Sequence, residues 1–301
     1  MLEIGLVDLD TSHPGAWCKI IKEEFKDTSV AAVWDGESVY PSGYAERFAE
    51  EHGVSKVCKN LEEMATLVDV AFIHGCNWDL HLERAAPFLK AGKGVFLDKP
   101  MVGNMKDLKK LEDLIKKGHK IIGGSSVRFA PEIEAFKLKN ENVISIFASS
   151  SFDPFNYGIH TIEMFGGILG KGVKSVSWLG SYITDLFLIE YGDGREVILQ
   201  LKSPTHHFHL TITTEKGISP ITINSSRIYK ALLKRIIPYF KGEKDYPVDF
   251  ETMSESIKVA LACQKAMDNK EKVNFSDLTE QDRGFDGAAF AREYKAKKFQ
   301  K

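Results

Sequence analysis

Cysteine is scarce in this sequence, and no two cysteines lie close together. Four occur in 301 residues, at Cys18, Cys58, Cys76 and Cys263, and none belongs to a CxxC pair. This spacing argues against a disulfide framework and against a structural zinc site. We therefore expect reduced thiols, as in a cytoplasmic protein, and no bound metal.

Long apolar runs and an excess of one charge are missing as well. No apolar stretch approaches the ~20 residues that span a bilayer, and the start shows no basic segment followed by an apolar one, as a secretion signal would. The 40 basic residues are balanced by 42 acidic ones, so no basic field would attract nucleic acid or an anionic membrane. We expect a soluble, cytoplasmic protein of two domains that binds neither.

The first 123 residues alternate short apolar runs with helical patterns. The runs are EIGLV, SVAAVWD, VDVAFIHG, GVFLDKP and KIIGG, with helices expected at about 16–25, 44–52, 80–91 and 105–117. Continuous apolar strands between amphipathic helices are covered on both faces, which predicts a Rossmann-like, doubly wound parallel sheet of α/β class. The carboxyl ends of its strands line one edge, where ligands bind.

Asp35 ends the second of these runs, 22 residues beyond His13. A carboxylate at this place can accept hydrogen bonds from both hydroxyls of an adenosine ribose. No basic residue follows closely to hold a 2′-phosphate, so NAD is favoured over NADP. The alternative is that Asp35 only ends a strand and starts a turn.

The turn after the first run lacks the glycines of a GxGxxG fingerprint. Alignment on the strand end puts Asp8, Asp10 and His13 in the three glycine places. Two carboxylates near a pyrophosphate are unfavourable, and a β-carbon limits the approach of the backbone. Asp10, Thr11 or Ser12 can nevertheless cap the following helix, whose free N–H groups form an anion site. These residues therefore predict a dinucleotide bound in a modified pose.

The run GVFLDKP ends in Asp98 and Lys99 at the same edge. A lysine there can donate a hydrogen bond to a reacting hydroxyl or exchange a proton with it, and burial would bring its pKa toward the working range. A Lys-Pro pair alone is a weak signal, because most lysines are merely solvated.

A longer segment around this pair resembles a known family. HLERAAPFLKAGKGVFLDKP, residues 81–100, is similar to the H-x-E-x-A … L-x-A-G-K-x-V-x-x-E-K-P segment of the glucose–fructose oxidoreductase / inositol dehydrogenase (Gfo/Idh/MocA) family, with Asp98 for glutamate. GGSSVRFAPEIEAFK resembles its domain junction, and the similarity extends to about residue 275. The resemblance implies that Asn77, His81, Asp98 and Lys99 contribute to the cofactor site. The loop at Asn77 is one residue longer than in the family, and the DLDTSHP turn marks a divergent branch.

Residues 124–279 show strands separated by turns. The pattern predicts an α+β domain with an open, largely antiparallel sheet, hairpins at YGDGREV and TTEKGI, one helix between the first two strands, and a closing helix at about 251–268. The resemblance implies a homodimer or homotetramer through this sheet. Residues 280–301 are polar and are expected to form a surface extension.

The chemical centre of this domain is expected in FDPFNYGIHTIEMFGG, residues 152–167. A helix here carries Asp-x-x-x-His in the family, and this sequence has Asn156-x-x-x-His160. Histidine titrates near neutrality, so His160 is the expected proton acceptor, with Lys99 polarising the oxygen. Asn156 can position a sugar ring but cannot act as a base. Tyr157 is a further proton carrier or sugar contact, and Glu163 is expected to be structural.

Two other features leave alternatives open. Arg128 could pin a carboxylate or phosphate of the substrate, or hold the domain hinge. The histidines at 206, 207 and 209 include a His-x-His pair, which puts two imidazoles on one face of a strand. No third ligand is evident, and an interface suits them better than a metal site.

The function expected from these features is NAD-dependent hydride transfer involving a carbinol carbon of a sugar, cyclitol or related polyhydroxy compound. Two alternatives remain: a non-catalytic sugar or nucleotide sensor on the same fold, and a lyase-like enzyme with tightly bound NAD. Fold alone does not decide among them.

Overall fold

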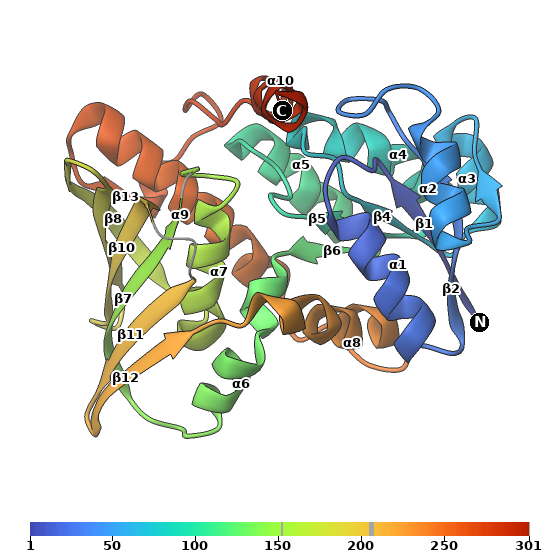
Figure 1. The fold of residues 1–301 in the computed structure, drawn as a ribbon. Coiled ribbons are helices and arrows are strands. Elements are labelled where there is room, and N and C mark those ends of the chain that lie inside the picture. Colours follow the sequence, from blue (N-terminus) through green and yellow to red (C-terminus); the bar gives the residue numbers. More distant parts are fainter. Residues whose placement is uncertain (152, 205–207, 301) are drawn as a thin grey trace.

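A computed structural model of the chain describes residues 1–151, 153–204 and 208–300 and contains two sheets (Figure 1). The first sheet has the order β3-β2-β1-β4-β5-β6, and all its strand pairs are parallel. Its strands are β1 (Leu2–Val7), β2 (Thr28–Trp34), β3 (Lys56–Val57), β4 (Val70–Ile73), β5 (Gly94–Asp98) and β6 (Ile121–Gly124). The predicted Rossmann-like sheet is confirmed.

Helices flank this sheet because its strands are apolar on both faces. Every residue of β4 and β5 is buried. The flanking helices are α1 (His13–Glu24), α2 (Tyr44–His52), α3 (Leu61–Leu67), α4 (His81–Lys90) and α5 (Met105–Lys116). Helix α1 begins three residues earlier than expected, so His13 lies in its first turn and Pro14 occupies a position that tolerates proline.

The second sheet has the order β12-β11-β7-β10-β9-β8-β13, in which only the β7–β10 pair is parallel among the described residues. Both predicted hairpins are present, as β9–β10 and β11–β12. The strands are β7 (Val143–Ser151), β8 (Val173–Ser181), β9 (Asp185–Tyr191), β10 (Glu196–Ser203), β11 (His209–Thr214), β12 (Gly217–Thr222) and β13 (Val273–Asn274). The predicted open, largely antiparallel sheet is confirmed.

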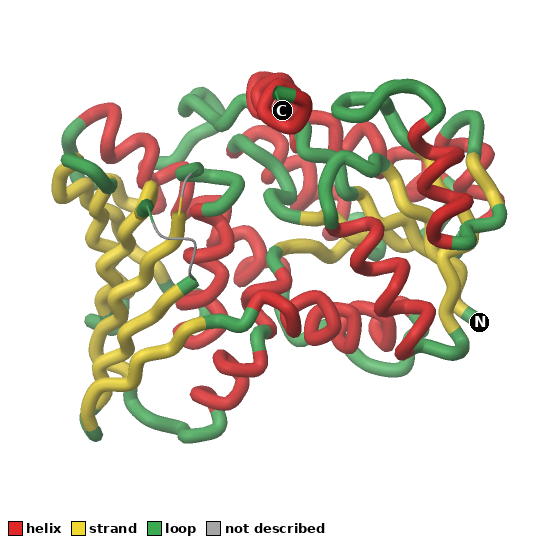
Figure 2. Tube along the Cα trace, viewed as in Figure 1, coloured by secondary structure: helices red, strands yellow, loops and turns green. Residues whose placement is uncertain are grey.

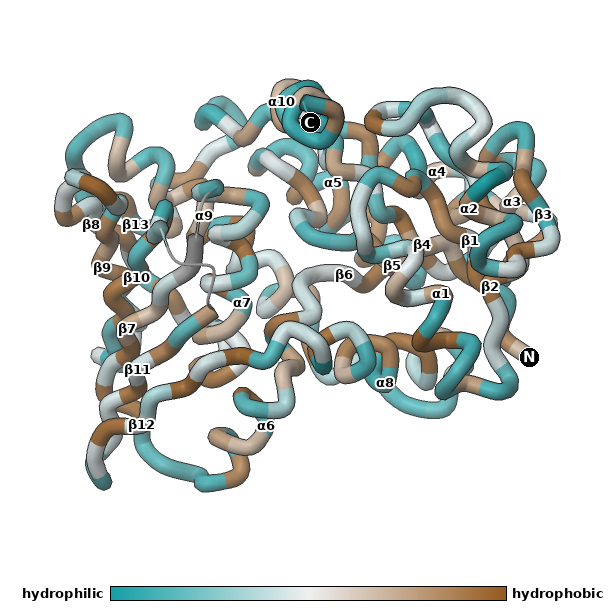
Figure 3. Tube along the Cα trace, viewed as in Figure 1, coloured by the Kyte–Doolittle hydropathy of each residue, from teal (hydrophilic) through white to brown (hydrophobic). Residues whose placement is uncertain are grey.

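One face of the second sheet is covered by α7 (Gly158–Leu169) and α9 (Phe250–Asn269) (Figure 2). Buried and partly exposed residues alternate along β9, so one side of the strand meets these helices. Figure 3 shows the same alternation of hydrophobic and hydrophilic residues in the sheet. Helix α7 lies between this sheet and the first domain, which places its residues at the junction.

Four helices were not anticipated, the first of which is α3 (Leu61–Leu67) in the first domain. Helix α6 (Pro131–Lys137) follows the hinge, and α8 (Ile228–Phe240) leaves the second sheet and packs against α1. The expected surface extension contains α10 (Gly287–Phe299), which lies across the top of the first domain (Figure 1). The C-terminal segment is therefore part of the packed structure.

Two sequence expectations concern membranes and histidines. Among the described residues, no helix combines the length and apolar character needed to cross a bilayer. The histidines at 206 and 207 lie outside the described residues. His209 is on β11, where its two ring nitrogens lie 3.1 Å from Thr222 Oγ1 and 3.0 Å from Thr211 Oγ1.

Candidate active site at the junction of the two domains

Lys99 links the edge of the first sheet to the segment that leads into α7. Its Nζ donates hydrogen bonds to Asn156 Oδ1 at 2.8 Å and to the Asn156 carbonyl oxygen at 3.3 Å. Burial lowers the pKa of Lys99, and the charges of Asp98 and Asp153 only partly oppose this effect. The structure thus brings together the lysine and the amide that the sequence singled out.

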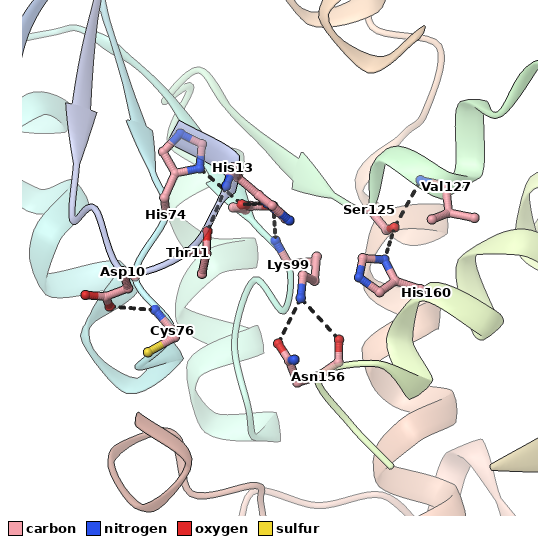
Figure 4. Close-up of polar contacts among 12 residues, drawn as sticks. Asp10, Thr11, His13, His74, Cys76, Lys99, Ser125, Val127, Asn156 and His160 are labelled. Carbon is pink, nitrogen blue, oxygen red and sulfur yellow. Dashed lines mark hydrogen bonds and ion pairs between the residues drawn. The ribbon is translucent and has the colours of Figure 1, made fainter. Parts of the chain in front are cut away.

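His160 lies in the first turn of α7, on the second-domain side of Lys99 (Figure 4). Its Nδ1 is 2.6 Å from Ser125 Oγ, a residue at the end of β6. Burial holds the pKa of His160 well below its usual value, and the positive charges of Lys99 and His13 lower it further. These surroundings therefore favour the neutral form of His160.

Helix α7 is fixed in this orientation by a buried ion pair. Glu163 Oε2 accepts a hydrogen bond from Arg128 Nε, and Glu163 Oε1 accepts one from Ser256 Oγ at 2.7 Å. Arg128 Nη1 also donates to the Gly166 carbonyl oxygen at 3.1 Å. These contacts support the hinge alternative for Arg128, and they agree with the structural role expected for Glu163.

The opening turn buries a carboxylate where the fingerprint has its first glycine. Asp8 has a φ of 60°, in the left-handed region that glycine favours. Its Oδ1 accepts a hydrogen bond from Gly36 N at 3.0 Å, and its Oδ2 lies 3.6 Å from Arg84 Nε. Burial raises the pKa of Asp8 to about 7, and the neighbouring charge of Asp10 adds to the effect. The side chain fills space that a glycine would leave open.

Asp10 and Asp35 are engaged at one oxygen each. Asp10 Oδ2 accepts from Cys76 N at 2.9 Å, and Asp35 Oδ1 accepts from Leu9 N at 3.1 Å. The second oxygen of each carboxylate is buried without a hydrogen-bond partner among the described residues. Burial raises the pKa of both groups. Unpartnered buried carboxylate oxygens are costly, so these two atoms are places where a ligand hydroxyl would be stabilising.

The start of α1 is capped only in part. Ser12 is the N-cap residue, but its side chain accepts no capping hydrogen bond from the helix. Thr11 Oγ1 accepts a hydrogen bond from His13 N at 3.2 Å. Pro14 has no N–H, and Ala16 N donates to the Ser12 carbonyl oxygen at 3.2 Å, so Gly15 is the residue of this first turn whose N–H is left for an anion.

His13, His74 and Asp98 form a buried cluster above the ends of β4 and β5. Asp98 Oδ2 lies 2.5 Å from His13 Nδ1 and 3.1 Å from His74 Nδ1, while Asp98 Oδ1 accepts from Lys99 N at 2.8 Å. Although burial acts to raise the pKa of Asp98, the two histidines hold it well below its usual value. No motif singled out His74, which directly follows β4.

The other two residues assigned to the cofactor site by resemblance contact the protein itself. The ring of His81 is fully buried between the carbonyl oxygens of Gly75, at 2.8 Å, and Met101, at 3.0 Å. Asn77 Oδ1 accepts a hydrogen bond from Asp79 N at 3.2 Å and packs closely against Gly287 of α10. Both residues shape the loop after β4, and their contact with a cofactor remains a prediction.

Helix α10 crosses the carboxyl edge of the first sheet. Trp78 Nε1 donates to the Phe285 carbonyl oxygen at 2.8 Å, just before the helix. Ala291 is buried against Cys76, from the loop after β4, and Val39, from the loop after β2. At the far end, Lys298 Nζ donates to the Asp10 carbonyl oxygen at 3.0 Å. The helix therefore covers the opening turn.

A cavity of about 560 Å³ lies between α10 and the segment that leads into α7. The ring of Tyr157 borders it, and its centroid is 5.8 Å from Lys99 Nζ. The remaining lining residues are Asp153 and Asn156 on one side and Phe290, Glu293, Tyr294, Lys297 and Lys298 of α10 on the other. The volume is in the range of small-molecule sites.

The same edge can be tested for its fit to a dinucleotide. The free oxygen of Asp35 suits a ribose hydroxyl, and Lys99 lies beside the cavity at the other end. Between them, Asp8 and Asp10 are buried and Ala291 closes the surface above the turn. The two ends fit the cofactor, whereas the turn between them is filled and covered in this structure.

Comparison with solved structures supports the fold. Scyllo-inositol dehydrogenase from Lactobacillus casei, with bound NAD(H) and scyllo-inositol, matches at a TM-score of 0.77 and 18% identity, over 92% of this chain and 99% of that one. Myo-inositol 2-dehydrogenase from Lactobacillus plantarum matches at 0.77 and 16%, over 91% and 99%. A putative NADPH-dependent oxidoreductase from Desulfitobacterium hafniense matches at 0.76 and 14%, over 92% and 98%.

Comparison of sequences gives a narrower result. No curated protein sequence matches the chain. Residues 18–124, however, match the profile of a family described as an oxidoreductase family with an NAD-binding Rossmann fold. This segment contains the Lys99 motif from which the resemblance was drawn. Over this segment, the first domain is similar to the Gfo/Idh/MocA oxidoreductase family.

Proposed function

We propose that this protein is an NAD-dependent oxidoreductase that transfers a hydride between nicotinamide and a carbinol carbon of a sugar, cyclitol or related polyhydroxy compound. The observation that carries the proposal is the contact of Lys99 Nζ with Asn156 Oδ1 at 2.8 Å, beside His160 and the cavity. An ammonium group with a lowered pKa beside a cavity can hydrogen-bond a reacting oxygen and exchange its proton.

The roles of the polar groups follow from their chemistry. Lys99 polarises the reacting oxygen, and His160 takes part in proton transfer from its fixed place next to Ser125. Asn156 holds Lys99 and offers its amide nitrogen to a substrate hydroxyl, while Tyr157 borders the cavity. NAD would carry out the redox step when bound, and the protein would contribute orientation and electrostatics.

The cofactor choice rests on Asp35 and on the helix that follows the turn. The free carboxylate oxygen of Asp35 would accept a ribose hydroxyl, and the N-terminus of α1 would face the phosphates. A 2′-phosphate would meet the Asp35 carboxylate instead of a cation, which favours NAD over NADP. The NAD(H) and scyllo-inositol bound by the Lactobacillus casei enzyme are consistent with this choice.

The second sheet is the proposed oligomer interface. Large apolar side chains are exposed on its strands and connecting turns, which is unusual for a surface that stays in water. They are Ile144, Phe147, Leu179, Tyr182, Ile183 and Ile218. A homodimer or homotetramer through this face would bury them, and light scattering at several concentrations would test it.

The experiment that tests the function begins with nucleotide binding. Purified protein is titrated with NADH and NADPH, after an aliquot has been denatured to detect nucleotide already bound. We expect NADH to bind more tightly, and Asp35→Ala to weaken it. A panel of sugars and cyclitols is then assayed for formation of NADH from NAD⁺. The proposal fails if no nucleotide is carried and none binds at millimolar concentration.

The filled opening turn favours one second candidate, a non-catalytic sensor on the same fold. Buried Asp8 and Asp10 leave no open cradle for a pyrophosphate in this conformation. A sensor would bind a sugar or a nucleotide without turnover. Ligand-induced stabilisation in the absence of NADH formation, across the whole panel, would support it over the oxidoreductase.

A further inference from the structure

We propose that His13, oriented by Asp98, is a further catalytic residue that accepts the proton of the substrate hydroxyl. The proposal rests on the proposed oxidoreductase function. His13 occupies the place of the third fingerprint glycine, where the family pattern has no side chain. Asn156, in turn, occupies the place of the family's aspartate and cannot take a proton. Compared with the family pattern, the chain lacks a proton acceptor at Asn156 and has a candidate acceptor at His13.

The two nitrogens of His13 have different surroundings. Nδ1 lies 2.5 Å from Asp98 Oδ2, at the distance of a charge-assisted hydrogen bond. No hydrogen bond among the described residues engages Nε2, and 11% of the side chain is exposed. A carboxylate that holds Nδ1–H leaves Nε2 as the basic atom and stabilises the imidazolium once it forms. His13 and Asp98 therefore have the geometry of a general-base pair.

The neighbouring histidine shows why the proposal concerns His13 alone. His74 also contacts Asp98 Oδ2, at 3.1 Å, but its side chain is completely buried. Its Nε2 is enclosed without a partner among the described residues. His74 can orient Asp98, yet no substrate can reach its free nitrogen. It is a positioning residue.

His13 also lies near the groups already assigned to the site. In Figure 4 its imidazole extends from the first-domain edge toward Lys99, with His160 beyond it. The charges of His13 and Lys99 both lower the pKa of His160, which requires all three to lie close together. Because its pKa is low, His160 can take part in the transfer but does not retain the proton, which needs a final acceptor. His13 meets that need because Asp98 balances its charge.

The groups that face His13 come from five elements. Asp98 and Lys99 adjoin the end of β5, His74 follows β4, and His160 lies on α7. From α8, the ring of Tyr229 packs on His13 at 4.9 Å between centroids, and its hydroxyl lies near the Ser12 side chain at the start of α1. Asp98 is the only carboxylate in hydrogen-bond contact with His13 among the described residues. At His13, the negative charge of Asp98 opposes the effect of the positive charge of Lys99.

The proposed step balances in protons and electrons. The C–H bond of the carbinol breaks and its hydride, with both electrons, reduces NAD⁺. The O–H bond breaks, its electron pair forms the carbonyl, and its proton passes to Nε2 of His13. The resulting imidazolium remains hydrogen-bonded to the Asp98 carboxylate and later releases the proton to water. In the reductive direction, the same imidazolium donates the proton.

A metal ion is the alternative occupant of two histidines and a carboxylate. The contact distances of 2.5 and 3.1 Å are those of hydrogen bonds. An ion about 2.0–2.2 Å from His13 Nδ1 and Asp98 Oδ2 would have to bind them at an acute angle, far from tetrahedral. The cluster in this structure is therefore a hydrogen-bonded one, and metal content becomes an outcome of the test.

The test compares His13→Gly, which restores the fingerprint glycine, with the wild type. We expect kcat for alcohol oxidation to fall by about 10²–10⁴-fold, as for loss of a general base, while NADH still binds. Added imidazole should restore part of the activity. His52→Gln, which alters another first-domain histidine that packs against α1, should leave kcat unchanged.

Asp98→Asn supplies a readout that does not depend on turnover. In the wild type we expect a far-downfield proton resonance from His13 Nδ1–H, which Asp98→Asn and His13→Gly should both abolish. Absence of that resonance overturns the dyad. So does equal turnover by His13→Gly and wild type, or one equivalent of metal that is lost in His13→Gly. If the wild type itself neither binds NADH nor turns over any compound, the proposed function fails instead, and the catalytic role of His13 fails with it.

Discussion

Charged and polar side chains are arranged differently at the two ends of the edge formed by the carboxyl ends of the first-sheet strands. At the substrate end, Lys99 and Asn156 meet across the domain junction beside a cavity of about 560 Å³. At the opening turn, Asp8 and Asp10 are buried and covered by α10. The first arrangement presents polar groups to a ligand, whereas the second directs them into the protein. The polar groups that resemble the family's are thus brought together at one end, and the opening turn is filled by side chains at the other.

The acidic and basic groups of the opening turn are held by contacts with several other loops. Asp8 needs Gly36 N and Arg84, His13 needs Asp98, and Asp10 needs Cys76 N. Each new acidic or basic group has a partner on a different loop, because a buried charge without one would be strongly destabilising. The substrate end, in contrast, depends on the fixed position of α7. Substitutions can therefore test separately the contacts of the opening turn and the fixed position of α7.

The largest expected effect is on turnover at the substrate end. Lys99→Ala should lower kcat by about 10²–10⁴-fold, because it removes the group that polarises the reacting oxygen. NADH binding should change little, since the Asp35 end of the edge is intact. Lys90→Ala, an exposed lysine at the end of α4, is the matched control. Loss of NADH affinity with kcat unchanged would show that Lys99 acts in binding alone.

The next effect is on stability and concerns the anchor of α7. Glu163→Gln leaves Arg128 buried without its counter-charge and should lower the free energy of unfolding by about 3–5 kcal/mol. Denaturant unfolding measures the change. Glu24→Gln, which breaks a surface pair with Lys230, should have no measurable effect. If both variants unfold at the same denaturant concentration, the ion pair does not anchor the helix.

Much of the fold could be predicted from local pattern. The strands of the first sheet are continuous apolar runs, and α2 was placed at its observed bounds. Helix α8 was missed, since it contains Pro238 and its apolar side packs against α1, far away in sequence. Helix α10 was missed because its lysine- and alanine-rich sequence shows no clear apolar face. Its partners, Val39 and Cys76, follow from tertiary structure alone.

The candidate site, like the fold, could be predicted from the sequence only in part. Lys99, Asn156 and His160 could be grouped because strand ends share one edge and because their spacing resembles the family's. The contact of His13 with Asp98 could not, since it depends on β4 lying between β1 and β5, so that the start of α1 reaches over β4. His74 was hidden at the end of an apolar run. Arg128 was left between two roles until its contacts with Glu163 and Gly166 were known.

A third prediction concerns the buried carboxylate of the opening turn. The pKa of Asp8 is raised from 3.8 to about 7, so the folded state binds a proton that the unfolded state has already lost between these values. The contribution of protonated Asp8 to the free energy of unfolding is fully present below about pH 4. It is lost as the pH rises through about 7, by up to about 4 kcal/mol, at 1.36 kcal/mol per unit of pKa shift. Asp8→Asn, which tolerates the same backbone conformation, should remove this loss.

Chemical denaturation at pH 5 and pH 8 measures the effect on Asp8→Asn and the wild type. Asp113→Asn, an exposed acidic residue of α5, controls for the change in net charge. Only the difference between the two pH dependences matters, because other carboxylates contribute equally to both proteins. Identical pH dependences in wild type and Asp8→Asn would mean that the turn opens to water in solution.

The smallest expected effect tests whether α10 must move for the dinucleotide to bind. Ala291 is buried in the same cluster as Cys76, so Ala291→Cys is a candidate for a disulfide with the loop after β4 on oxidation. If the helix has to leave the turn, the oxidised form should bind NADH at least about tenfold more weakly, because the competent state is depopulated. Reduction should restore binding. Lys298→Ala, which removes the contact with the Asp10 carbonyl oxygen, should instead speed association.

Equal NADH binding by the oxidised and reduced forms, with the cross-link verified by thiol counting, would mean that the dinucleotide binds with α10 in place. The cover over the opening turn would then be a permanent wall of the cofactor site, and the contrast between the two ends would lie in the buried carboxylates alone.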